Sequence, residues 1–210
     1  MVGGIALEAC LNEPAVEQVT AIGRRSTGVD HPKLCEITHA DFSDCTALHD
    51  SLADVDAALF CLGVYSGALP DDQFRTITVD YALRFGEALH AASPEATLCF
   101  LSGQGADTAE TSRVAFARYK GIAENGLQAM GLGAVHVFRP GYIYPVSPRD
   151  EPNFGYRMMR AVYPAIRMVY ANAGISSVDL GRAMAHAAVH GRQGPAILEN
   201  RDIQAFADGL

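Results

Sequence analysis

Two glycines and two arginines near the start of the chain have the spacing expected of a dinucleotide-binding unit. Gly3 and Gly4 open a short apolar helix, and Arg24 and Arg25 follow the next apolar stretch. Glycine at a helix start lets the backbone approach a pyrophosphate, which the helix N-terminus stabilises. An acidic residue at the later position would favour NAD, whereas arginine suits the 2′-phosphate of NADP. The arginines alone are equally typical of a solvated surface, but beside the glycines they predict NADP as the cofactor.

Two further pairs of residues follow predicted strands, where a bound dinucleotide would pass. Asp41 and Phe42 come after the stretch 34–38 and are expected to flank the adenine, although a helix-capping turn is nearly as typical of this pair. Leu62 and Gly63 end the most apolar stretch, where a small residue lets the backbone approach the cofactor. A simple strand stop would have the same residues.

These residues lie between stretches that alternate between strand-like and helical patterns. Strands are expected at 16–22, 34–38, 55–62, 96–101, 135–138 and 196–199, and helices at 4–11, 44–52, 71–92, 114–130, 153–170 and 177–189 and at the C-terminus. Alternating elements of this kind form parallel βαβ units with right-handed crossovers. The predicted fold class is therefore α/β, with a doubly wound parallel Rossmann-type sheet in a single domain over 1–210. Residues 142–210 are expected to form a small C-terminal region on the substrate side.

The glycine pattern at the start of the chain is incomplete. A Gly-x-x-Gly-x-x-Gly turn would follow a buried strand and would contain further glycines before Gly3. We therefore expect Met1 to be an internal methionine of a longer protein, whose first strand would lie between 16–22 and 55–62. Without that strand, the chain is expected to be poorly soluble or markedly less stable, and to bind NADP(H) weakly or not at all. A preference for NADP(H) over NAD(H) is expected in any version with an intact glycine loop.

Composition excludes several functional classes. The net charge of −8 over 210 residues argues against nucleic-acid binding, which needs a basic surface. No apolar run approaches the roughly 18 residues of a membrane span, and the N-terminus has no signal-peptide pattern, so a cytoplasmic protein is expected. The five cysteines form no Cys-x-x-Cys pair and the seven histidines have no zinc spacing, which predicts no metal site. His186 and His190, four residues apart, are more typical of packing or surface.

Five short segments occur together in an order that points to one family. They are Val19–Arg25, Phe60–Gly63, Leu101–Asp107, Val137–Gly141 and Ile197–Asn200. With them the chain resembles the Tat-interacting-protein family of atypical short-chain dehydrogenases, over nearly its whole length. This resemblance implies a doubly wound sheet that binds NADP(H) without a metal, with Arg139, Pro140 and Gly141 among the cofactor-binding residues.

The catalytic residues of short-chain dehydrogenases are present only in part. Their Tyr-x-x-x-Lys pair and a serine or threonine move a proton to and from the substrate oxygen, and the lysine also holds the nicotinamide ribose. Lys120 matches the lysine, but the residue four positions earlier is Phe116, which has no exchangeable proton. The family's two serines after the preceding strand are Ser102 and Gly103 here, so only the first hydroxyl is present.

Two tyrosines lie near these positions. Tyr119 is next to Lys120 in sequence, about 100° further around the helix, and is expected to face elsewhere. Tyr142 follows Gly141 and is a further candidate for the catalytic set with Lys120 and Ser102, although packing or the lining of a substrate loop is more typical of it.

Three functional hypotheses follow from these residues. The first is an NADP(H)-binding protein without ordinary reductase activity, which acts as a cofactor sensor or binds a protein partner, including a second copy of itself. The alternative is an NADP-dependent oxidoreductase or sugar-nucleotide-type epimerase that uses a non-standard proton donor. The third is a product that keeps the fold but binds no cofactor.

Overall fold

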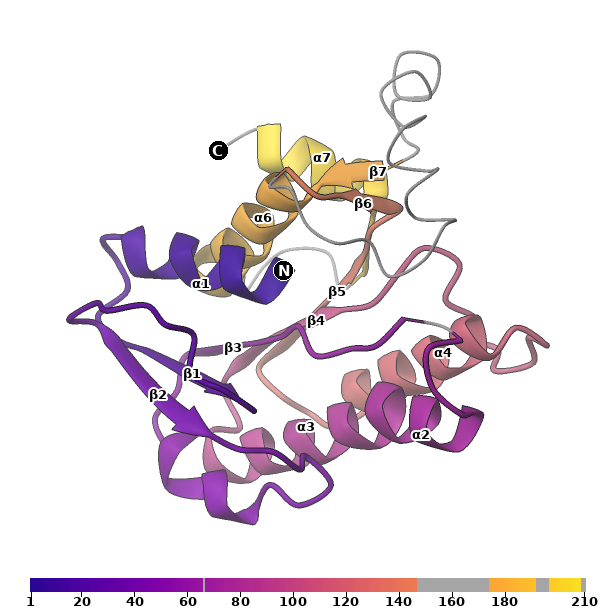
Figure 1. The fold of residues 1–210 in the computed structure, drawn as a ribbon, viewed down its shortest axis with the longest axis horizontal. Coiled ribbons are helices and arrows are strands. Elements are labelled where there is room, and N and C mark those ends of the chain that lie inside the picture. Colours follow the sequence, from indigo (N-terminus) through magenta and orange to yellow (C-terminus); the bar gives the residue numbers. More distant parts are fainter. Residues whose placement is uncertain (66, 147–173, 192–196, 209–210) are drawn as a thin grey trace.

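Helices lie on both faces of a parallel β-sheet in the computed structural model, which describes residues 1–65, 67–146, 174–191 and 197–208 (Figure 1). The strands are β1 (Val19–Gly23), β2 (Leu34–Thr38), β3 (Ala57–Phe60), β4 (Thr97–Leu101), β5 (Ala134–Arg139), β6 (Tyr142–Tyr144), β7 (Gly174–Ser176) and β8 (Ile197–Glu199). The helices are α1 (Val2–Asn12), the 3₁₀ helix η1 (Thr46–Ser51), α2 (Asp71–Arg75), the π-helical stretch η2 (Thr76–Asp80), α3 (Tyr81–Ala92), α4 (Ala115–Gln128), α6 (Ser177–His190) and α7 (Asn200–Asp208).

The main sheet has four parallel strands in the order β3–β4–β5–β8. One row of paired residues crosses all four strands, from Phe60 through Phe100 and Val137 to Ile197. Short apolar strands of this kind are typical of a parallel sheet that is covered on both faces. Helices connect β3 to β4 and β4 to β5, which confirms the predicted α/β, doubly wound Rossmann-type class.

β1 and β2 form a separate parallel pair beside the main sheet. Within the described residues, β1 pairs only with β2 and β3 pairs only with β4, so no paired strand lies where the central one was expected. The two sheets are joined by packing, because Ile22 and Ile37 contact the same buried cluster as Phe60. β6 and β7 form a third parallel pair.

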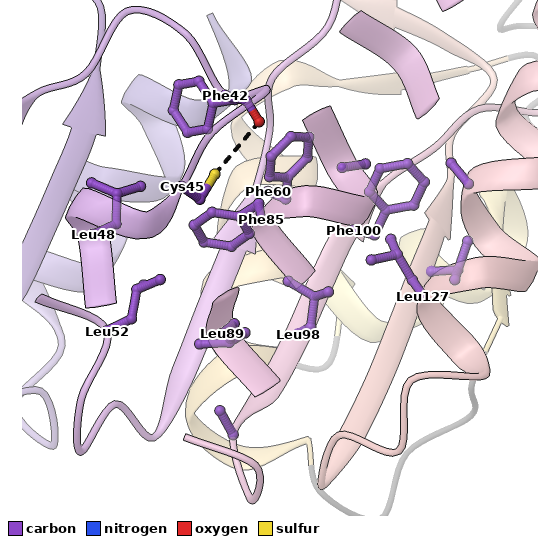
Figure 2. Packing of buried hydrophobic residues seen from close by; sticks show 14 residues of the cluster. Phe42, Cys45, Leu48, Leu52, Phe60, Phe85, Leu89, Leu98, Phe100 and Leu127 are labelled. Carbon is purple, nitrogen blue, oxygen red and sulfur yellow. Dashed lines mark hydrogen bonds between the residues drawn. The ribbon is translucent and has the colours of Figure 1, made fainter. Parts of the chain in front are cut away.

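The largest buried cluster lies between the sheet and helices α3 and α4 (Figure 2). Phe42, from the loop after β2, has its ring centroid 6.4 Å from that of Phe60 and 6.5 Å from that of Phe85. The Phe60 ring lies 5.3 Å from Phe85 and 6.1 Å from Phe100. These aromatic contacts hold the residues after β2 next to the main sheet.

Helices α1 and α6 pack against each other on the opposite face of the sheet (Figure 1). Gly181 permits this close approach, because a Cβ there would lie 2.6 Å from Cγ2 of Ile5 and 3.1 Å from the backbone nitrogen of Ala6. Both helices contribute to a second buried cluster, which includes Phe138 of β5 and Met184 of α6. The position of α1 over the sheet is therefore fixed by α6.

Two of the expected helices differ from the structure, two strands were not expected, and one expected helix is not described. Residues 44–52 contain a 3₁₀ helix instead of an α-helix, and the helix expected at 71–92 is divided by η2. Strands β6 and β7 were not predicted, because three residues are too short to give a periodic pattern. The predicted helix at 153–170, with Arg157, Arg160 and Arg167, lies outside the described residues, as do parts of the region 142–210.

All five cysteines are free thiols. Burial raises the pKa of Cys61 to about 12 and that of Cys10 and Cys45 to about 11, so these thiols are protonated at neutral pH.

Among the helices that the structure describes, none is both long enough and apolar enough to cross a bilayer.

Candidate functional site

The N-terminus of α1 lies at the end of β3. No side chain caps the helix, and the N–H groups of its first turn have no intrahelical partner. A Cβ at Gly3 would lie 3.2 Å from Cβ of Cys61, the residue directly after β3, whereas Gly4 and Gly63 border open space. Leu62 packs against the main core. An uncapped helix start beside small residues fits the pyrophosphate of a dinucleotide, which helix N–H groups and the helix dipole stabilise.

Arg24 and Arg25 lie on the surface directly after β1. Glu36 of β2 holds the turn that follows them, because its carboxylate accepts hydrogen bonds from the Ser26 hydroxyl at 2.8 Å and the Thr27 backbone N–H at 2.6 Å. Hydrogen bonds from Thr27 and then Ser26 lower the pKa of Glu36. Glu36 is therefore ionised at neutral pH and engaged with the turn.

Asp41 and Phe42 have different surroundings. Phe42 is 3% exposed and its ring belongs to the core, so its side chain is not available to a ligand. Asp41 is exposed, and hydrogen bonds from Ser43 lower its pKa. Burial first, and then the Asp41 carboxylate, raise the pKa of Tyr81, while the charge of Arg24 has a smaller opposite effect. The charges of Asp41 and Arg24 thus act on the same tyrosine in opposite directions.

Lys120 extends from α4 to the end of β4. Its Nζ donates a hydrogen bond to the Leu101 carbonyl oxygen at 2.8 Å and lies 4.7 Å from the ring centroid of Phe100. Burial lowers the pKa of Lys120 to about 8, an effect that the carboxylate of Glu124 partly offsets. At neutral pH this lysine is a buried cation at the carboxyl edge of the sheet, where doubly wound folds bind their ligands.

The ring of Phe116 covers Gly103. A Cβ at Gly103 would lie 2.6 Å from Cζ and 3.4 Å from Cε1 of Phe116. The two positions at which a short-chain dehydrogenase carries its phenol and its second hydroxyl are therefore in contact, and both are apolar here. Of the expected proton-relay residues, Lys120 and Ser102 are present.

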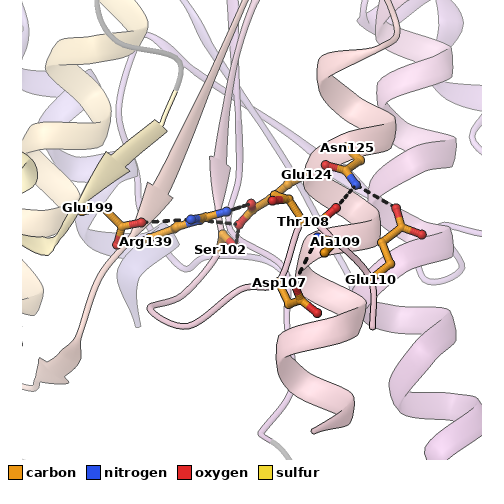
Figure 3. Close-up of polar contacts among 9 residues, drawn as sticks. All are labelled: Ser102, Asp107, Thr108, Ala109, Glu110, Glu124, Asn125, Arg139 and Glu199. Atoms are coloured by element: carbon orange, nitrogen blue, oxygen red, sulfur yellow. Dashed lines mark hydrogen bonds and ion pairs between the residues drawn. The ribbon is translucent and has the colours of Figure 1, made fainter. Parts of the chain in front are cut away.

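A buried ionic network joins the carboxyl ends of three strands (Figure 3). Glu124 of α4 is fully buried and accepts hydrogen bonds from the Ser102 hydroxyl and from Arg139, whose Nη2 lies 2.5 Å away. Arg139, at the end of β5, also donates to Glu199 of β8 at 2.9 Å. A carboxylate paired with arginine can only accept hydrogen bonds, so Ser102 donates its hydroxyl proton to Glu124.

Pro140 and Gly141 use their backbones to join neighbouring loops. The Pro140 carbonyl accepts a hydrogen bond from the Gln104 N–H at 2.9 Å, and the Gly141 N–H donates to Oδ1 of Asn200 at 2.8 Å. Together with the ion pair of Arg139, these bonds attach the end of β5 to the start of α7. The segments Val137–Gly141 and Ile197–Asn200, both part of the family resemblance, are therefore bonded to each other.

The two tyrosines near the catalytic positions face different parts of the molecule. The Tyr119 hydroxyl donates to Asp71 at 2.6 Å, and its ring centroid is 5.8 Å from that of Phe74. Tyr119 thus packs against α2, in agreement with its predicted orientation. Tyr142 lies in β6 opposite Gly174 of β7.

The loop between β4 and α4 is fixed on the helix (Figure 3). The Asp107 carboxylate accepts hydrogen bonds from three backbone N–H groups further along this loop. Nδ2 of Asn125 donates to the Thr108 carbonyl at 2.9 Å. The closest approach is at Gly121, where a Cβ would lie 1.8 Å from the Asp107 carbonyl oxygen. The loop is therefore held in one arrangement against α4.

The structure brings Lys120, Ser102 and Arg139 together at the carboxyl edge of the main sheet. The sequence did not predict the roles of Glu124 and Glu36. Glu124 binds Ser102 and Arg139, and Glu36 holds the turn after Arg24 and Arg25. Glu124 had a readable signal, because it stands four residues after Lys120 and therefore on the same helical face. Glu36 had none, since an acidic residue on an exposed strand face is ordinary.

Replacing Lys120 with methionine is expected to change how stability depends on pH. The pKa of this lysine is lowered from its usual 10.5 to about 8, so between these values the unfolded chain binds more protons and stability rises with pH. The free energy of unfolding of the wild type relative to Lys120→Met should therefore rise by about 2 kcal/mol between about pH 7 and about pH 9.5. Urea titrations at both pH values measure this difference. The titration of the cysteines contributes equally to both proteins and therefore cancels. A difference that stays constant with pH would contradict the buried position of the ammonium.

The sequence comparisons find one distant relative. No family model matches the chain. It is 28% identical over 159 residues to the protein fmp52, mitochondrial, of Emericella nidulans, and the alignment covers 72% of this chain and 66% of that protein. The chain thus spans about two thirds of the length of this relative.

Solved structures share the whole fold at low identity. A short-chain dehydrogenase family protein from Francisella tularensis has a TM-score of 0.63 and 13% identity, covering 97% of this chain and 94% of its own. A putative NAD-dependent epimerase/dehydratase from Bacillus halodurans has a TM-score of 0.66 and 16% identity, covering 100% and 95%. WbmG of Bordetella bronchiseptica, in complex with NAD, has a TM-score of 0.66 and 11% identity, covering 100% and 74%. The chain therefore shares the α/β fold of these proteins.

Proposed function

We propose that this protein binds NADP(H), lacks ordinary carbonyl-reductase activity, and acts as a cofactor sensor or through a protein partner. The fold is that of proteins such as WbmG, which was solved with NAD. Cofactor binding is supported by the uncapped start of α1 and by the exposed Arg24 and Arg25 after β1. The proposal assigns the chain to the atypical short-chain dehydrogenases that resemble the Tat-interacting-protein family.

The proposed cofactor contacts follow the carboxyl edge of the sheet. The first turn of α1, with Gly3 and Gly4, would hold the pyrophosphate, Arg24 and Arg25 the 2′-phosphate, and Lys120 the nicotinamide ribose. A bound nicotinamide supplies hydride transfer, whereas this chain supplies binding and orientation. The further cofactor-binding residues proposed are Asp41, Phe42, Leu62, Gly63, Arg139, Pro140 and Gly141.

The absence of ordinary reduction rests on the contact between Phe116 and Gly103. General acid–base catalysis contributes about 10²–10⁴-fold to a rate, and it needs a proton donor within hydrogen-bond reach of the substrate. Phe116 has no such proton, and its ring fills the space of a side chain at position 103. The hydroxyl proton of Ser102 is donated to Glu124, so it is not available to a carbonyl oxygen.

A second candidate function is an NADP-dependent oxidoreductase or epimerase with a non-standard proton donor. One observation favours it: burial lowers the pKa of Lys120 to about 8, close to the pH at which a general acid works best. Tyr142 is the other candidate for this role, because the Ser102 proton is donated to Glu124.

We also propose a cytoplasmic location and a protein partner or a homodimer. The five free thiols support a reducing compartment. A sensor that performs no turnover must pass its signal to another molecule, which is why a partner belongs to the proposal.

The proposed function is tested by following NADPH consumption with a panel of aldehydes and ketones. Wild-type turnover is expected to stay near the background of the uncatalysed reaction, because the phenol and the second hydroxyl are missing. Tyr142→Phe and Tyr119→Phe should leave this background unchanged. Substantial wild-type turnover that collapses in either variant would favour the second candidate function instead.

A further inference from the structure

The turn after β1 is attached at both of its ends, to β2 and to the residue that directly follows β2. At its start, the Gly23 carbonyl accepts a hydrogen bond from the His39 N–H at 2.9 Å. At its end, the carboxylate of Glu36 accepts from the Ser26 hydroxyl at 2.8 Å and from the Thr27 N–H at 2.6 Å. The residues between these two attachments have little freedom to move.

The turn is also ordered internally. Gly28 has a φ of +73°, which glycine adopts without strain, and its N–H donates to the Ser26 oxygen at 3.1 Å. The Val29 N–H donates to the Thr27 hydroxyl oxygen at 3.2 Å. Ser26 therefore links Glu36 to the rest of the turn, since its hydroxyl donates to the carboxylate and accepts from Gly28.

We infer that Glu36 is a positioning residue for cofactor selection, which fixes Arg24 and Arg25 in the arrangement that receives a 2′-phosphate. Both arginines are exposed and stand between the attachment at Gly23 and that at Ser26. A binding site that is ordered before the ligand arrives loses less conformational entropy on binding. This inference rests on the proposed function, because it concerns the same NADP site.

The negative charge of Glu36 could also affect phosphate binding directly, and this effect can be distinguished from positioning. An anion close to a phosphate site weakens phosphate binding through repulsion. Glu36 directs its carboxylate oxygens to donors of the turn, so its positioning effect strengthens binding instead. The two effects have opposite signs, and a variant that keeps the charge while breaking the attachment distinguishes them.

The test is calorimetric titration of NADP⁺ and NAD⁺ into the wild type, Glu36→Gln, Ser26→Ala and Glu17→Gln. Glu36→Gln places an amide where the carboxylate accepts two hydrogen bonds, and Ser26→Ala removes one donor without a change of charge. Both should lower the preference for NADP⁺ over NAD⁺, by roughly three- to tenfold, with little change in NAD⁺ affinity. Glu17→Gln removes an exposed carboxylate that precedes β1 and should leave the preference unchanged.

Three results would overturn the inference. An unchanged preference in both Glu36→Gln and Ser26→Ala would show that the attachment does not matter. A stronger preference in Glu36→Gln, with none lost in Ser26→Ala, would show that Glu36 acts by charge alone. A wild type without NADP⁺ preference would overturn the proposed function and this inference with it. The first two results overturn the inference alone, so the two failures are distinguishable.

Discussion

Combined replacement of Phe116 by tyrosine and Gly103 by serine is expected to create NADPH-dependent carbonyl reduction. Residue 116 lies one helical turn before Lys120, the spacing at which a lysine can lower the pKa of a phenol. The two changes restore the proton donor and the orienting hydroxyl, and general acid–base catalysis contributes about 10²–10⁴-fold. The rate of NADPH oxidation with the same carbonyl panel should rise by about that factor over the wild type.

The single variants are the controls for this gain. In the pair and in Gly103→Ser alone, the new Cβ would lie 2.6 Å from Cζ of residue 116, so the ring must move in both. Gly103→Ser alone gains no phenol. Phe116→Tyr alone supplies the phenol without the second hydroxyl. Each should give much less activity than the pair. A folded double variant that binds NADPH and remains at background would show that this site does not have the geometry of a short-chain dehydrogenase.

Replacing Gly121 with alanine is expected to destabilise the protein by about 3 kcal/mol, because overpacking against atoms that cannot move is costly. A Cβ there would lie 1.8 Å from the carbonyl oxygen and 2.3 Å from the carbonyl carbon of Asp107. These are backbone atoms of a loop that Asn125 and Ala117 hold against α4. For a chain of this size the loss corresponds to a fall in melting temperature of about 6–12 °C, which thermal unfolding measures.

Gly126→Ala is the matched control on the same helix. A Cβ at Gly126 would lie 2.5 Å from Cδ2 of Leu83, the far end of a flexible side chain that can rotate away. Alanine also favours the helix over glycine by about 1 kcal/mol at either position. Gly126→Ala should therefore remain within about 1 kcal/mol of the wild type. Equal melting temperatures for both variants and the wild type would contradict the tight seating of the loop on Gly121.

Most elements could be predicted from the sequence because their patterns are long enough to be periodic. The strand at 34–38 and the helices α1, α4 and α6 were found within a few residues of their bounds. Strands β6 and β7 have three residues each and leave no period to detect. The 3₁₀ helix in 44–52 differs from an α-helix in the spacing of its backbone hydrogen bonds, which the pattern of so short a segment does not record.

The site was predictable where function depends on residue type, and less so where it depends on packing. Lys120 and Phe116 could be assigned from a spacing of four on one helical face. The burial of the Phe42 side chain could not, because an aromatic residue after a strand can face either a ligand or the core. The contact of Glu124 with Ser102 and Arg139 joins residues far apart in sequence, and no local pattern records such a contact.

The most direct test of the proposed function is a calorimetric titration of the wild type and Arg24→Ala with NADPH and with NADH. We predict that the wild type binds NADPH more tightly than NADH by about ten- to a hundredfold, since a charge-assisted contact to phosphate is worth about 1.5–3 kcal/mol. Arg24→Ala should lose most of this preference while its affinity for NADH stays the same. Equal affinities for the two cofactors in the wild type, unchanged in Arg24→Ala, would contradict the proposal that this fold selects NADP(H).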